Sequence, residues 1–162
     1  MQSLASLIDE NTLLVSLMHV NNETGAINDI QKLASLTKKI NKNSLFMSDG
    51  VQAYGKLPVK LHSTVVDLYT ISGHKVHAPK GIGALYVKKG VKIAPVFWGG
   101  GQERNLRSGT ENVANIVCLG EIADKILHTS INSCADFKNS KNTILKIVAV
   151  SYTHLRAHET GR

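Results

Sequence analysis

Three short apolar segments in the first half of the chain are each followed by polar residues and a glycine. These segments cover residues 12–18, 45–47 and 65–71. Their length and their content of β-branched and other apolar side chains predict buried strands. Between the first two segments, apolar residues recur at helical spacing over residues 30–40, which predicts an amphipathic helix. We expect Asn28 to cap that helix.

The order of strand, helix, strand, short helix and strand is typical of βαβ units. It predicts an α/β fold with a mostly parallel sheet and flanking helices. Glycines open a further strand at residues 81–87, and another short strand is expected at residues 92–97. Because Pro95 cannot donate a hydrogen bond to a sheet, this last strand is expected at an edge or a bend.

The second half of the chain predicts helices. One is expected to start near Thr110, and Cys118 beside its apolar face is expected to be a buried structural thiol. The predicted face is made of Val113, Ile116, Val117, Gly120, Ala123 and Leu127. A weaker helix is expected at residues 135–148, with Cys134 in the polar link before it. Residues 1–150 therefore read as one partial domain, and residues 151–162 as a tail of frame-shifted, vector or assembly origin.

Polar residues that can carry chemistry follow each of the three predicted parallel strands. Asn22 follows the first, Asp49 the second and Lys75 the third. A lysine by itself is usually an ordinary surface residue, and Asn22 by itself suits a turn. Because the carboxyl ends of parallel strands meet at one edge of a sheet, we expect the three side chains to converge there.

An amine, a carboxylate and an amide at one edge suit pyridoxal phosphate. The amine can bond the cofactor aldehyde, the carboxylate can pair with the ring nitrogen, and the amide can bind the ring hydroxyl. Ser72, His74 and the backbone around Gly73 are expected to hold the phosphate. Residues 98–110 form a glycine-rich loop that is neither a P-loop nor a dinucleotide fingerprint. Its end, near Thr110, is either an anion site or a plain helix cap.

The net charge of +7 over 162 residues changes this picture little. The basic residues are scattered and are not interleaved with aromatic residues, so nucleic-acid binding is disfavoured. The excess of positive charge suits an anionic small ligand or an acidic partner. The two cysteines have no metal-ligand spacing, so no metal site is predicted. No segment suits a membrane span or a signal peptide, and we expect a cytoplasmic protein.

Five ordered blocks resemble the central part of the cysteine desulfurases, which are enzymes of the class V aminotransferase family with the pyridoxal-phosphate-dependent type I fold. The resemblance covers residues 10–128. The blocks are Met18 to Gly25, Asp49 to Gln52, Ser72 to Lys75, Pro79 to Tyr86 and Arg104 to Thr110. The resemblance implies that this chain is part of the large domain of such an enzyme.

The resemblance also implies roles for individual residues. Lys75 would hold the cofactor and move the Cα proton of the substrate, and Asp49 would pair with the pyridinium nitrogen. Asn22 and Gln52 would contact the ring hydroxyl or the substrate side of the cofactor. The phosphate would be bound by three residues, which are Ser72, His74 and, from a neighbouring subunit, Thr110.

The implied reaction removes sulfur from L-cysteine, giving L-alanine and an enzyme persulfide for iron–sulfur cluster assembly or tRNA thiolation. The implied partners are a second subunit and a sulfur-acceptor or scaffold protein. Neither Cys118 nor Cys134 matches the family's persulfide-forming loop, so the chain by itself is expected to be inactive. A selenocysteine lyase, another class V enzyme and a non-catalytic scaffold or binding module remain as alternatives.

Overall fold

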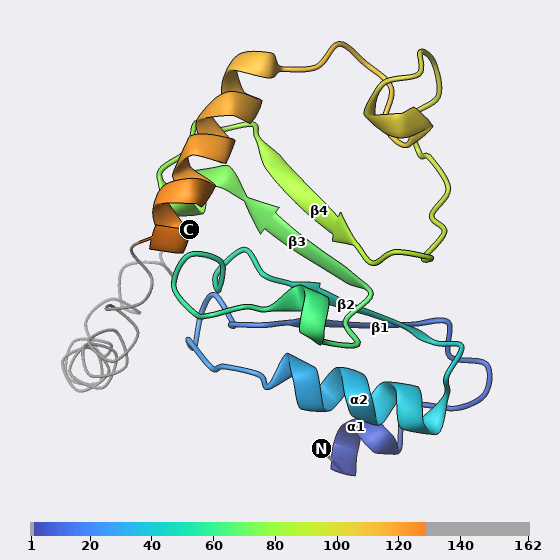
Figure 1. Cartoon of the computed structure of the whole chain (residues 1–162). Helices are drawn as coiled ribbons and strands as arrows, with labels where there is room; N and C mark the ends of the chain where they lie inside the picture. The colour runs from blue at the N-terminus through green and yellow to red at the C-terminus, as the bar shows by residue number, and fades with distance from the viewer. Residues whose placement is uncertain (1, 129–162) are drawn as a thin grey trace, which may run out of the picture.

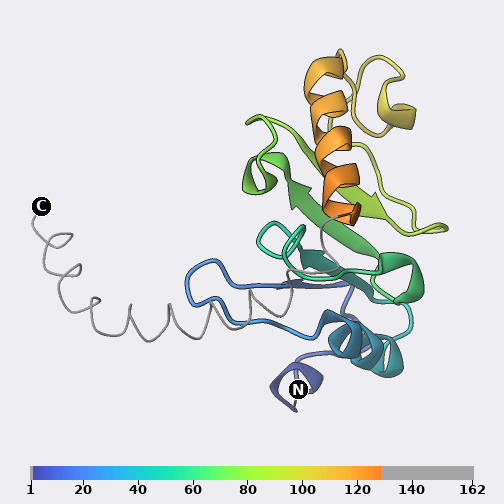
Figure 2. The same cartoon turned by 60° about the vertical axis from the view of Figure 1, so that its left-hand side comes forward.

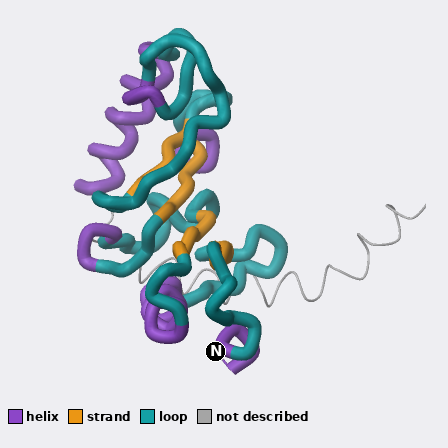
Figure 3. The backbone as a smooth tube through the Cα atoms, turned by 90° about the vertical axis from the view of Figure 1, so that its right-hand side faces the viewer, coloured by secondary structure: helices purple, strands orange, loops and turns teal. Residues whose placement is uncertain are grey.

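The computed structural model describes residues 2–128 (Figure 1). The helices and strands are α1 (Gln2–Ala5), β1 (Leu14–Met18), α2 (Ile30–Ile40), β2 (Leu45–Asp49), β3 (Leu68–Ser72) and β4 (Gly83–Val87). Three 3₁₀ turns are η1 (Leu61–Ser63), η2 (Gly73–Val76) and η3 (Glu103–Asn105). Residues 113–128 form a further helix. Long loops connect these elements (Figure 3).

The four strands form one sheet in the order β1-β2-β3-β4. The first two pairs are parallel, and β4 runs antiparallel to β3. The register pairs Met18 with Asp49 and Asp49 with Thr70, so the three parallel strands end almost level. The predicted α/β fold with a mostly parallel sheet is confirmed.

The main core lies between α2 and the parallel strands. Phe46 and Ala34 are fully buried there, with Val15, Ile30 and Val66 around them. The α2 helix presents its apolar side to the sheet, as its spacing predicts, and lies below the sheet in Figure 1.

The predicted cap of α2 is wrong by one residue. Asp29 is the N-cap, and its side chain accepts a hydrogen bond from the backbone nitrogen of Lys32 at 3.1 Å. The side chain of Asn28 instead donates to the carbonyl oxygen of Met18 at 2.7 Å. Asn28 therefore anchors the start of the helix to the end of β1.

Two predicted boundaries in the second half are also wrong. Residues 92–97 contain no strand, since Pro95 removes a ladder donor and the chain leaves the sheet edge after β4. The helix starts at residue 113 rather than near Thr110. The side chain of Asn112 accepts from the backbone nitrogen of Asn115 at 3.4 Å, which is N-cap chemistry.

The helix over residues 113–128 buries a different face from the predicted one. Leu119, Ile122 and Ile126 pack against Val76 and Ala78, in the chain that follows β3. Figure 2 shows the helix running along the β3–β4 side of the molecule.

Side chains of the predicted face are exposed instead, namely Val113, Ile116, Val117 and Leu127. Cys118 is also exposed, which contradicts its prediction as a buried thiol. The helix has apolar positions on two sides, and tertiary contacts select between them. The predicted helix at residues 135–148, Cys134 and the tail from residue 151 lie outside the described residues.

Candidate active site

The carboxyl ends of β1, β2 and β3 lie on the left-hand side of Figure 1. Each strand runs directly into a loop or turn there, at residues 19–28, 50–57 and 73–77. Because these strands are parallel neighbours, the residues that follow them gather at one edge of the sheet. This edge carries most of the predicted site residues.

The loop after β1 is folded by Asn21 rather than by Asn22. The Asn21 side-chain oxygen accepts hydrogen bonds from the backbone nitrogens of Glu23 and Thr24, at 3.0 and 2.8 Å. Such a local side-chain bond stabilises a turn. Asn22, beside it, is exposed.

The carboxylate of Asp49 ends β2. Its Oδ1 atom accepts from the backbone nitrogen of Val51 at 2.9 Å and from the hydroxyl of Thr70 at 3.4 Å. The residue is half-buried. These two hydrogen bonds fix the orientation of its carboxylate against β3 and against the turn that follows β2. Gln52 lies in the same turn and is also half-buried.

A hydroxyl and an imidazole form a pair at the end of β3. Ser72 Oγ and His74 Nδ1 are hydrogen-bonded at 2.8 Å. Between them, Gly73 is buried, and a Cβ atom there would lie 2.8 Å from Ile82 Cγ2 and 3.0 Å from Ala78 Cβ. The tight turn therefore requires glycine, and it brings the two polar side chains together.

The amine of Lys75 lies in the same turn, η2, and the residue is exposed. A second lysine that no local sequence pattern predicts as a site residue, Lys56, lies nearby in the turn after β2. Burial lowers the pKa of Lys56, and the positive charge of Lys75 lowers it further. The two cations therefore interact, which makes this part of the edge attractive to an anion.

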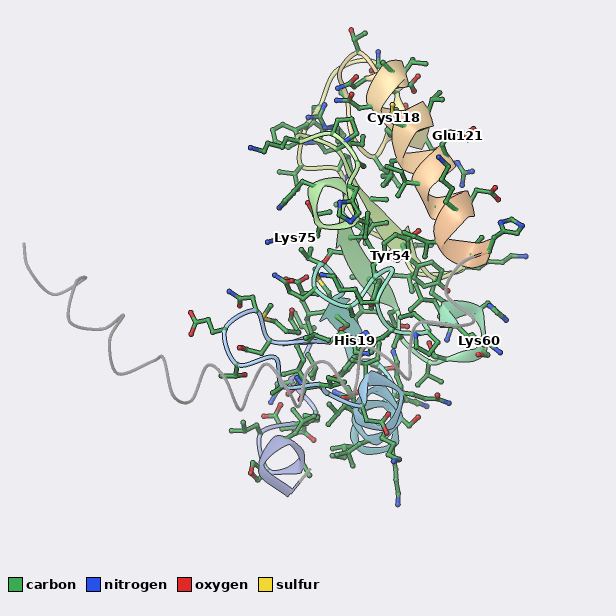
Figure 4. All side chains as sticks on the ribbon, turned by 90° about the vertical axis from the view of Figure 1, so that its left-hand side faces the viewer. His19, Tyr54, Lys60, Lys75, Cys118 and Glu121 are labelled. Carbon is green, nitrogen blue, oxygen red and sulfur yellow. The ribbon has the colours of Figure 1, made fainter. Side chains whose placement is uncertain are left out.

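Lys75, Tyr54 and His19 mark the segments that follow β3, β2 and β1 (Figure 4). Burial raises the pKa of Tyr54. By contrast, Thr110 is exposed and follows the loop of residues 99–109, which lies on the upper right of Figure 1, away from this edge. The edge thus holds the six predicted residues that lie at or just after the ends of the three strands, namely Asn22, Asp49, Gln52, Ser72, His74 and Lys75. Thr110 follows a different segment of the chain.

His19 gives the edge a pH dependence. The residue is buried, and burial lowers its pKa below 6.5, although the charge of Asp29 partly opposes this. Below about pH 6.5 the unfolded chain therefore binds a proton that the folded chain resists, and stability falls as the pH falls. One such proton changes the free energy of unfolding by at most about 1.4 kcal/mol per pH unit.

Urea unfolding between pH 7.5 and 5 measures this slope. A double variant, His19→Leu with Tyr69→Phe, removes the imidazole and its hydrogen-bonded partner together. We expect a shallower slope for the double variant, because it lacks the protonation of His19 that is linked to unfolding. If the free energy of unfolding changed with pH equally in the two proteins, a lowered pKa for His19 would be contradicted.

The described part of the chain holds no group of three or more histidine, cysteine, aspartate or glutamate residues that could bind a metal ion. Over the same residues, no helix is both long and apolar enough to cross a bilayer. The edge itself carries an amine, a carboxylate, an amide and a hydroxyl–imidazole pair.

Comparison with known proteins agrees with the fold. The family model described as aminotransferase class-V matches residues 1–159, and the chain belongs to that family. Enzymes of this family depend on pyridoxal phosphate.

Within the family, the chain is similar to cysteine desulfurases. It is 46% identical over 129 residues to a cysteine desulfurase of Nostoc sp., covering 79% of this chain and 32% of the relative. It is 38% identical over 167 residues to the cysteine desulfurase IscS of Methanosarcina thermophila, covering 98% of this chain and 39% of the relative. The chain thus spans about a third of the length of these relatives.

Solved structures give the same result. A NifS-like protein superposes with a TM-score of 0.77 at 42% identity, over 83% of this chain and 36% of the other. A structure described as SspA in complex with cysteine gives a TM-score of 0.71 at 37% identity. The match covers 76% of this chain and 35% of the other.

Proposed function

We propose that this chain forms part of a cysteine desulfurase and binds pyridoxal 5'-phosphate at the carboxyl edge of its parallel strands. The observation that carries the proposal is the set of groups that three adjacent strands bring to one edge. A carboxylate follows β2, a hydroxyl–imidazole pair and an amine follow β3, and an exposed amide follows β1. This set matches the aldehyde, phosphate, ring nitrogen and hydroxyl of the cofactor.

Each residue of the edge has a proposed role. Lys75 would hold the cofactor through its aldehyde and would move the Cα proton of the substrate. Asp49 would pair with the ring nitrogen and keep it protonated, a task for which its anchored carboxylate is suited. The remaining contacts are assigned to Asn22 and Gln52 for the ring hydroxyl or substrate side, and to Ser72 and His74 for the phosphate. When bound, the cofactor supplies an electron sink for the substrate Cα.

The proposed reaction takes sulfur from L-cysteine, with L-alanine as the product and a persulfide on the enzyme. Support comes from the names of the relatives and from the neighbour described in complex with cysteine. Cys118 is exposed on the helix over residues 113–128, and we assign the persulfide to neither Cys118 nor Cys134. A sulfur-acceptor or scaffold protein is the proposed partner, and the cytoplasm the proposed location.

We also propose a homodimer in which Thr110 reaches the phosphate site of the second subunit. The loop and helix around Thr110 expose apolar side chains that a second copy would cover. Trp98 is 81% exposed, Val96 82% and Val113 62%. Exposed apolar area of this kind typically marks an interface.

Chemical trapping tests the cofactor site directly. The purified protein is mixed with pyridoxal phosphate, reduced with borohydride, digested and mapped by mass spectrometry. We expect the label on the peptide that contains Lys75, because the phosphate-binding pair in the same turn holds the aldehyde beside that amine. Label spread evenly over the exposed lysines, such as Lys80 and Lys89, would contradict the proposal.

A further inference from the structure

A buried tyrosine and a buried histidine join the outer two of the three parallel strands. Tyr69 of β3 is 1% exposed, and His19, directly after β1, is 8% exposed. Tyr69 Oη and His19 Nδ1 are hydrogen-bonded at 2.9 Å, with the donor set by the histidine tautomer. The two rings meet edge to face, with centroids 6.0 Å apart. Neither residue belongs to the set assigned to the cofactor above.

This side-chain bond crosses the strand between them. The sheet order places β2 between β1 and β3, and the tyrosine ring passes over Gly50 at the end of β2. A Cβ atom on Gly50 would lie 2.0 Å from Cε1 and Cζ of Tyr69. Any side chain at position 50 would therefore occupy the space of the ring, so glycine is what allows the bond to reach His19.

Backbone hydrogen bonds join the same three strands around Asp49. The backbone nitrogen of His19 donates to the carbonyl oxygen of Asp49 at 2.8 Å. The backbone nitrogen of Gly50 donates to the carbonyl oxygen of Thr70 at 2.9 Å. The peptide groups of Asp49 are thus bonded to the two strands that the Tyr69–His19 pair ties together.

The environment of Tyr69 places it near Asp49 as well. Burial raises the pKa of Tyr69, and the negative charge of Asp49 raises it further. If the strand ends moved apart, a buried hydroxyl and a buried imidazole would each lose its partner, and unpaired buried polar groups are costly. A phenylalanine ring would fill the same volume without this constraint on spacing.

We propose that the Tyr69–His19 pair, passing over Gly50, holds the ends of β1, β2 and β3 at one fixed separation and so positions Asp49 relative to the turn that carries Ser72, His74 and Lys75. Tyr69 and His19 are positioning residues: they act through the strand ends and contact neither cofactor nor substrate. The inference rests on the proposed cofactor site.

The test compares two tyrosines on neighbouring strands. Tyr69→Phe removes the hydroxyl and keeps the ring, while Tyr86→Phe makes the same change on β4, opposite Tyr69 in the register. Affinity for pyridoxal phosphate is measured by absorbance titration well below the unfolding temperature of each protein. We expect about tenfold weaker binding for Tyr69→Phe, equivalent to about 1.4 kcal/mol, and a change within twofold for Tyr86→Phe.

A double variant separates positioning from stability. Tyr69→Phe with His19→Leu removes both polar partners, so neither position keeps an unpaired buried group and the unfolding temperature should recover toward that of the unmodified protein. The Tyr69–His19 hydrogen bond is still absent, so the affinity for pyridoxal phosphate should stay about tenfold below that of the unmodified protein. Recovery of affinity together with stability would overturn the proposal, as would unchanged affinity in Tyr69→Phe.

Hydrogen exchange keeps the inference separate from the proposed function. If the unmodified protein binds no pyridoxal phosphate, the proposed function fails. The effect of the Tyr69–His19 hydrogen bond on the strand ends is then measured by hydrogen exchange at the backbone amides of His19 and Gly50. Faster exchange at both in Tyr69→Phe but not in Tyr86→Phe supports a tie across the strand ends. Equal exchange in the two variants overturns it.

Discussion

Replacement of Lys75 by alanine is expected to abolish the visible absorbance band that forms when pyridoxal phosphate is added to the protein. The band requires a covalent bond between the cofactor aldehyde and an amine. Lys75 is the exposed amine in the turn that also carries the hydrogen-bonded Ser72 and His74. Without it, the phosphate can still bind, but the aldehyde loses the one amine that lies in the same turn as the Ser72–His74 pair.

Two further variants separate chemistry from charge. Lys75→Arg keeps a cation at the site and removes the nucleophilic amine, so it should also lack the band. Lys80→Ala removes one exposed cation five positions along the same segment and should keep the band. Circular dichroism checks that each variant is folded. A band of full intensity in folded Lys75→Ala would exclude this lysine as the anchor.

Replacement of Asp67 by alanine is expected to lower the free energy of unfolding by about 3–5 kcal/mol. Asp67 is 4% exposed, and its Oδ2 lies 2.6 Å from the Lys38 amine. The same oxygen accepts from the backbone nitrogen of Phe46 at 2.8 Å. The carboxylate thus joins α2, β2 and the start of β3, and its removal leaves a largely buried lysine and a buried N–H group without this partner.

An exposed ion pair in the same helix is the control. Lys32 and Asp29 lie 2.9 Å apart, but their side chains are 69% and 51% exposed. Lys32→Ala should therefore cost no more than about 1 kcal/mol. Urea unfolding of both variants measures the difference. If Asp67→Ala were as mild as Lys32→Ala, the buried pair would not be a main support of the sheet.

The candidate site was predictable where a local pattern decides it. Asp49 and Lys75 each follow a short apolar segment, and parallel strands bring their carboxyl ends to one edge whatever the loops do. Lys56 was missed because its relation to Lys75 comes from the packing of the turn after β2, and no local pattern records that packing.

The spacing of the apolar residues and the order of the predicted strands and helix along the chain determined the class of fold. Alternating apolar segments and one amphipathic helix specify a parallel βαβ sheet, because each must bury an apolar face. Only the tertiary structure decided between competing local choices. The last described helix buries Leu119 and Ile122 rather than Val113 and Val117, because the chain after β3 offers Val76 and Ala78 to one side only. The hydrogen bond between Tyr69 and His19 likewise depends on the strand order and on the space over Gly50. The two residues are 50 positions apart in the sequence, so only the folded chain brings them together.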